Sequence, residues 1–127
     1  MKHFIDISNF ELKKLDFIIE KAKQIKNNPK KFANKCNNKT LGMIFQKDST
    51  RTRASFTVGF QKLGGNTIEL NSKSIGFGER ESIEDILRTL AQFIDVLVIR
   101  NDDHEILNKL SSLNALPIIN GLTDMSH

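Results

Sequence analysis

The sequence predicts a three-layer α/β domain in which helices flank a four-stranded parallel sheet. Short apolar runs, typical of strands covered on both faces, alternate four times with segments whose apolar residues recur every three or four positions. Parallel strands need helical crossovers of this kind, and such crossovers are nearly always right-handed. The length of 127 residues suits one domain with one core, so we expect no second lobe within this chain.

The first expected helix is amphipathic and lies near the start of the chain. Ser8 or Asn9 can cap it, because their side-chain oxygens can accept hydrogen bonds from the free amides of a first helical turn. Asn27, Asn28 and Pro29 end it. We expect one face to be buried, because its apolar residues follow the three-four spacing of a helix. These residues are Leu12, Leu15, Ile18, Ile19, Ala22 and Ile25.

Two strands and a second helix follow a polar loop. The apolar run at 41–45 predicts a strand covered on both faces, and residues 46–50 form a polar turn. A helix begins near Arg51 and stops at Gly64, where glycine permits a left-handed backbone. Its inward residues are Phe56, Phe60 and Leu63. Residues 67–70 form the second strand.

The third helix follows a long loop. Residues 71–80 are rich in Ser and Gly and exceed the ~2 to 6 residues that usually join a strand to a helix, which is typical of loops that close over ligands. Ser82 and Asp85 resemble a capping box at the helix start. The inward stripe comprises Ile83, Ile86, Leu87, Leu90 and Phe93.

The last part of the chain predicts two more strands around a fourth helix. Residues 96–99 are the clearest buried strand, and residues 103–113 carry the inward apolar positions of a helix. Residues 116–119 form the final strand, and the turn-prone residues 120–124 lead away from it.

Composition and charge exclude several classes of protein. The 19 basic and 15 acidic residues give a net charge of +4, and the excess lies in the first forty residues, which carry ten lysines and four acidic residues. All nine aromatic residues are Phe, several within apolar runs, so nucleic-acid binding through the basic region is only a distant alternative.

Cys36 is the only cysteine, so neither an internal disulfide nor a cysteine metal cluster is expected. Without an apolar run of membrane-spanning length or a signal peptide, we expect a cytoplasmic protein with no membrane partner.

Polar residues collect where the expected strands end. Residues 48–53 follow the first strand, Arg100 follows the third, and residues 120–127 follow the fourth. In an open α/β sheet, ligands bind beyond the carboxyl ends of the strands. Because these ends carry hydroxyls, guanidinium groups and an imidazole, the sequence predicts an anion site at this edge.

The segment 49–53 indicates phosphate as the anion. It lies at a helix start, where free amides and the helix dipole already attract phosphate, and three hydroxyls add further donors. Arg51 and Arg53 can each offer a fork of N–H groups. On residue types alone the alternative stays open that these arginines are solvated or pair with Asp48 or Glu81. The segment lacks the pattern of a nucleotide-binding P-loop.

Several motifs resemble the aspartate and ornithine transcarbamylases, in order and at matching spacing over essentially the whole chain. Residues 45–56, followed by 63–65, resemble the carbamoyl phosphate motif of this family. Residues 81–85, 98–100 and 117–127 resemble the ornithine branch, whose members read Asn-Gly-Leu before the catalytic histidine. The resemblance implies transfer of a carbamoyl group from carbamoyl phosphate to L-ornithine, giving L-citrulline and phosphate, within arginine metabolism and the urea cycle.

The resemblance also implies a role for each matching residue. The residues implied to bind the phosphate are Ser49, Thr50, Arg51 and Thr52. Arg100 and His127, with Thr52, would approach the carbamoyl oxygen, so that Arg51, Arg100 and His127 form the catalytic set. Leu122 would stand where a backbone carbonyl meets the ornithine amine. No metal and no cofactor are implied.

The resemblance further implies that these residues form only part of a family member. Residues 1–127 would form only the carbamoyl-phosphate-binding domain, while the second domain that binds ornithine is absent, so we expect no catalysis by this chain alone. Family members form trimers through this domain, which makes a homotrimer the expected assembly. Gly76 aligns with the Gln or His that a neighbouring subunit normally offers to the phosphate, and glycine has no side chain to offer. The alternative is a noncatalytic remnant or interaction module that keeps the fold.

Overall fold

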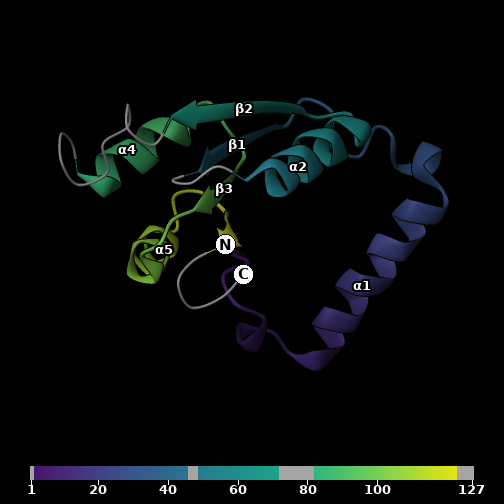
Figure 1. The fold of residues 1–127 in the computed structure, drawn as a ribbon, viewed down its shortest axis with the longest axis horizontal. Helices are drawn as coiled ribbons and strands as arrows, with labels where there is room; N and C mark the ends of the chain where they lie inside the picture. Colours follow the sequence, from purple (N-terminus) through teal and green to yellow (C-terminus); the bar gives the residue numbers. More distant parts are fainter. Residues whose placement is uncertain (1, 46–48, 72–81, 123–127) are drawn as a thin grey trace.

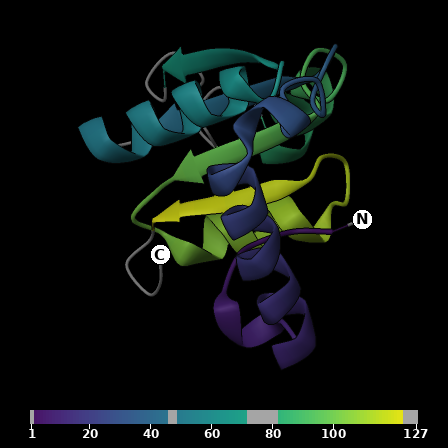
Figure 2. The same ribbon diagram turned by 90° about the vertical axis from the view of Figure 1, so that its right-hand side faces the viewer.

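Four parallel strands form a single sheet in the order β2-β1-β3-β4. The structure, a computed structural model, describes residues 2–45, 49–71 and 82–122. The strands are β1 (Thr40–Phe45), β2 (Asn66–Asn71), β3 (Val96–Arg100) and β4 (Ile118–Leu122). Their arrowheads point the same way, toward the side of the sheet at which α2 begins (Figure 2). The parallel sheet that the sequence predicts is confirmed.

Helices cover both faces of this sheet, as a three-layer domain requires (Figure 1). The α-helices are α1 (Leu12–Asn27), α2 (Thr50–Lys62), α4 (Ile83–Leu90) and α5 (His104–Ser112), and the short 3-10 helices are η1 (Ile7–Asn9) and η2 (Pro29–Phe32). Alternate residues of β1 face opposite ways, so Ile44 packs in a cluster with residues of α4 and α5, while Met43 packs in a cluster with α2. Leu87, Leu107 and Leu110 are fully buried in the first cluster.

The signals at the ends of two helices are confirmed. The Ser82 side chain accepts a hydrogen bond from the Asp85 amide at 3.1 Å, as the capping pattern predicts for the start of α4. Gly64 follows α2 with φ +92°, and its amide donates to the carbonyl of Gln61 at 3.0 Å. Phe93, expected on the inward stripe, is 74% exposed, because α4 ends at Leu90 and Phe93 lies in the turn beyond it.

The start of α1 differs from the prediction. Ser8 and Asn9 belong to η1, which Asp6 caps, whereas α1 begins after Glu11 without a side-chain cap. Phe10 separates the two helices: its backbone is extended, and its ring packs on Phe4 at a centroid distance of 4.8 Å. The N-cap residue of α1 is therefore Glu11 rather than Ser8 or Asn9.

The apolar face of α1 is also less covered than expected. None of its described side chains is buried, and Leu12, Phe17 and Ile19 are 76%, 66% and 54% exposed. Figure 1 shows α1 at one side of the molecule. Between α1 and α2 lies an open apolar groove of about 610 Å³, whose lining includes Ile25 and Phe60. Helical periodicity identifies the apolar face, but the described chain supplies no segment that covers it.

β4 lies further along the chain than the predicted strand, and residues 120–122 belong to it rather than to a turn. The Asn120 amide donates to the Phe4 carbonyl at 2.7 Å, and its side-chain Nδ2 donates to the Ile5 carbonyl at 2.9 Å. The segment around Phe4 therefore runs beside β4 as a further strand-like element. These long-range bonds hold turn-prone residues in an extended conformation.

Candidate functional site

The ends of three strands meet at one edge of the sheet. Arg100, the last residue of β3, lies opposite Phe45, the last residue of β1. On its other side Arg100 lies opposite Leu122 of β4, because an irregularity in the register passes over Gly121. A Cβ atom at Gly121 would come within 3.3 Å of the Ile99 carbonyl oxygen, so glycine suits this close approach. The sheet thus places Arg100 centrally at the predicted edge.

The first turn of α2 begins at Thr50, five positions after β1 ends. Ser49 is its N-cap residue, and the Ser49 carbonyl accepts the first helical hydrogen bond from the Arg53 amide at 2.9 Å. The Ser49 hydroxyl makes no capping hydrogen bond, so it can serve a ligand. The amides of a first helical turn have no partner within their own helix. This turn therefore combines backbone and hydroxyl donors with the positive end of the dipole of α2.

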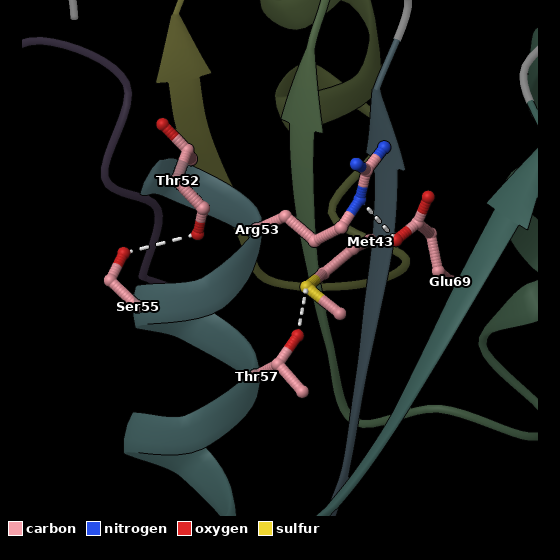
Figure 3. A network of polar contacts seen from close by, with 6 residues as sticks. All are labelled: Met43, Thr52, Arg53, Ser55, Thr57 and Glu69. Atoms are coloured by element: carbon pink, nitrogen blue, oxygen red, sulfur yellow. Dashed lines mark hydrogen bonds and ion pairs between the residues drawn. The ribbon is translucent and has the colours of Figure 1, made fainter. Parts of the chain in front are cut away.

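The structure brings most of the predicted phosphate-binding residues into this turn. Thr50 and Arg51 are exposed, while Thr52 and Arg100 are half-buried. The Thr52 carbonyl accepts a hydrogen bond from the Ser55 hydroxyl at 3.1 Å, within the same helix (Figure 3). The predicted hydroxyls and Arg51 are therefore grouped on one helical turn, and Arg100 stands at the adjoining end of β3.

Other predicted positions lie outside the described residues. These are His127, Gly76, Asp48 and Glu81. Leu122 is described in its backbone, which ends β4 beside Arg100.

Arg53 takes part in an ion pair that the sequence did not predict. Its Nε donates to Oε1 of Glu69 on β2 at 2.7 Å, and its guanidinium carbon lies 5.6 Å from the centroid of the Phe45 ring (Figure 3). Glu69 lies opposite Met43 in the sheet register, and Met43 faces α2. The alternation of side chains along β2 was the available signal, since it places Thr67 and Glu69 on one face.

A cavity of about 390 Å³ lies between α2 and the adjacent strands, with Thr50 at its edge. Its lining residues are Met43, Thr50, Arg53, Ala54, Thr57, Val58, Thr67 and Glu69. The Thr57 hydroxyl donates to the Met43 sulfur at 3.7 Å (Figure 3). Neither Arg51 nor Arg100 lines this cavity. It therefore shares Thr50 and Arg53 with the segment predicted to bind the anion, whereas Arg51 and Arg100 do not line it.

Other reactive groups lie away from this edge. Burial raises the pKa of the Cys36 thiol, which disfavours the thiolate form that a nucleophile needs. Among the described residues, no group of three His, Cys, Asp or Glu side chains could hold a metal ion. No described helix has both the length and the apolar character needed to cross a membrane.

Comparisons with known proteins show the family to which the chain belongs. Residues 2–127 match the family model described as "Aspartate/ornithine carbamoyltransferase, carbamoyl-P binding domain". An ornithine carbamoyltransferase from Nitrosomonas eutropha is 34% identical over the whole chain, which covers 42% of that relative. One from Chlorobaculum tepidum is 54% identical over 70% of this chain and 26% of its own length.

A solved structure extends the agreement from sequence to fold. The ornithine carbamoyltransferase from Pyrococcus furiosus superimposes with a TM-score of 0.90 at 34% identity, over 96% of this chain and 40% of that one. The chain thus spans about two fifths of the length of several relatives that match 96% or more of it. The chain belongs to the aspartate/ornithine carbamoyltransferase family, within which it corresponds to the carbamoyl-phosphate-binding domain.

Proposed function

We propose that residues 1–127 form the carbamoyl-phosphate-binding half of an ornithine carbamoyltransferase. The observation that carries this proposal is the juxtaposition at the sheet edge, where the donor-rich first turn of α2 follows β1 and Arg100 ends the neighbouring β3. Such a turn favours a phosphate group, and a guanidinium nearby favours the rest of a small anionic substrate.

Each residue has a distinct proposed role. Residues 49–52 bind the phosphate through hydroxyls, amides and the Arg51 guanidinium. Arg100, Thr52 and His127 bind the carbamoyl oxygen, and the Leu122 backbone carbonyl accepts a hydrogen bond from the ornithine amine. Arg51, Arg100 and His127 are the proposed catalytic residues.

The reaction is attack of a neutral amine on the carbamoyl carbon. The new C–N bond forms as the bond from that carbon to the phosphate oxygen breaks, and the amine nitrogen loses one proton to the departing phosphate. Negative charge grows first on the carbamoyl oxygen and then on the departing phosphate. Fixed donors that face such charge are commonly worth ~3 to 4 kcal/mol each, so Arg51 and Arg100 can supply the required positive charge without a metal or a cofactor.

The rest of the proposed activity needs groups beyond these residues. We place the ornithine-binding groups on a second domain, and we expect the isolated chain to form no citrulline. A homotrimer in the cytoplasm, acting in arginine metabolism, is the proposed setting. A noncatalytic remnant remains the alternative, and it predicts the same fold without useful affinity for carbamoyl phosphate.

Isothermal titration with carbamoyl phosphate tests the proposal. The unmodified chain should bind, and Arg51→Ala should weaken binding at least tenfold, because it removes the guanidinium of the phosphate-binding turn. Arg88→Ala is the matched control, since Arg88 is an exposed arginine on α4 and pairs with Glu84. Equal affinity in all three chains, or no binding to the unmodified chain, would contradict the proposal and favour the remnant.

A further inference from the structure

The ion pair between Arg53 and Glu69 connects α2 to the sheet. Arg53 lies in the same helical turn as the residues proposed to bind the anion. Glu69 belongs to β2, whereas Arg53 lies in the second half of the first helical turn, four residues after the N-cap. The same guanidinium lies over the ring of Phe45, and Phe45 is the register partner of Arg100. A continuous set of contacts therefore runs from β2 through α2 and β1 to Arg100.

In the described part of the chain, the partly buried apolar side chains that pack α2 on the core lie beyond its first turn. The apolar contacts of α2 with the core involve Phe56 and Phe60, which lie one and two turns further on. Thr50 and Arg51 are exposed. Helix ends fray when nothing holds them, and a frayed first turn would lose the aligned amides on which anion binding depends.

A carboxylate close to a phosphate site needs a separate explanation. By charge alone Glu69 would weaken the binding of an anion, because like charges repel. Its hydrogen bond draws Arg53 toward β2, whereas Arg51, two positions earlier on the helix, projects in another direction. The two arginines are therefore not equivalent donors.

We propose that Glu69 is a positioning residue: by holding Arg53 against β2 and Phe45, it fixes the first turn of α2 at the place where residues 49–52 and Arg100 can bind one phosphorylated ligand together. This inference rests on the proposed function of that site. Glu69 acts through Arg53 and does not contact the ligand. Preorganisation of this kind increases affinity because the turn does not have to be ordered when the ligand binds.

The sign of the change in affinity tests the proposal. Glu69→Leu should weaken carbamoyl phosphate binding about three- to tenfold, a range typical of coupling between residues in contact. Glu69→Gln keeps an oxygen acceptor for Arg53 and should lose less. If Arg53 were instead a direct ligand of the phosphate held back by Glu69, both variants would bind more tightly.

Glu84→Leu is the matched control, because Glu84 accepts from Nε of Arg88 at 2.9 Å in the same kind of pair on α4. Both leucine variants remove an exposed ion pair and should lower the melting temperature by a similar small amount. Only the positioning role predicts that the Glu69 variants also lose affinity for carbamoyl phosphate. Titration calorimetry at about 0.15 M salt measures this affinity.

Unchanged or tighter binding in both Glu69 variants would overturn the positioning role, while a loss of binding in Arg51→Ala would still uphold the proposed function. No binding by the unmodified chain would overturn both. If Glu69→Leu fails to fold, Glu69→Gln decides alone, because it is nearly isosteric with Glu69.

Discussion

Replacing Gly64 by alanine should destabilise the domain, whereas the same replacement at Gly59 should stabilise it. Gly64 has φ +92°, and a Cβ atom there would lie 2.6 Å from the Ala33 carbonyl oxygen and still nearer the Asn37 side chain. Gly59 lies within α2, and a Cβ atom there would meet nothing within 4 Å. The two substitutions add the same methyl group only five positions apart.

The magnitudes follow from these two environments. A left-handed backbone costs an alanine about 1–2 kcal/mol, and the contact with a backbone oxygen adds about 1–3 kcal/mol of overpacking. We therefore expect Gly64→Ala to lower the free energy of unfolding by roughly 2–5 kcal/mol. Alanine is the better helix former by about 0.5–1 kcal/mol, so Gly59→Ala should raise it by that amount.

Urea denaturation followed by circular dichroism at 222 nm measures both changes. In a domain of this size each kcal/mol shifts the melting temperature by about 4 °C, so thermal scans should separate the two variants by roughly 10–25 °C. If the two variants differ by less than about 0.5 kcal/mol, the turn after α2 does not depend on its left-handed glycine, and the reasoning fails.

Three further predictions concern the edge strand, a helix cap and the thiol. Asn120→Ala should cost about 1–3 kcal/mol in urea denaturation, because it removes the buried donor to the Ile5 carbonyl. Ser82→Ala should cost about 1 kcal/mol in the same assay, because the Asp85 amide loses its cap. Cys36 should react with iodoacetamide more slowly in the folded than in the unfolded chain at pH 8, since its raised pKa favours the thiol. The same shift should lower stability as pH rises above the pKa of the unfolded thiol, and Cys36→Ser should reduce this dependence.

Each of these predictions has an outcome that contradicts it. An unchanged stability of Asn120→Ala would mean that the segment around Phe4 does not depend on its bond to β4. Equal stability of Ser82→Ala and the unmodified chain would mean that the start of α4 needs no side-chain cap. Faster alkylation of folded than unfolded Cys36 would contradict the raised pKa.

Elements whose signals are local could be predicted from the sequence. β1 and β3 are continuous apolar runs, and both central strands are buried as such runs predict. Ser82 and Gly64 act within a few residues of their own positions, so their roles follow from neighbouring sequence. Such local structures depend little on contacts with residues that are far away in the sequence.

The elements that differed depend on partners far away in the chain. Asn120 has the local preference of a turn residue, but its bonds to the segment around Phe4 place it in β4. The apolar face of α1 follows the predicted periodicity, yet periodicity does not say what covers a face. In both cases the missing information was the identity of a neighbour in space.

In the candidate site, too, the sequence predicts which residue types gather but not the direction in which each arginine side chain points. The sequence predicts a cluster of hydroxyls and arginines at a helix start, and α2 does begin in this segment, with Ser49 as its N-cap residue. That this cluster and Arg100 bind one ligand stays a prediction. Two residues that are two positions apart on a helix cannot face the same way, so helical geometry alone requires Arg51 and Arg53 to differ in role. Only the sheet register, which sets Glu69 opposite Met43 beneath α2, shows that Arg53 is the arginine drawn to the sheet. Arg51 is therefore the arginine of this turn on which the proposed phosphate affinity should depend.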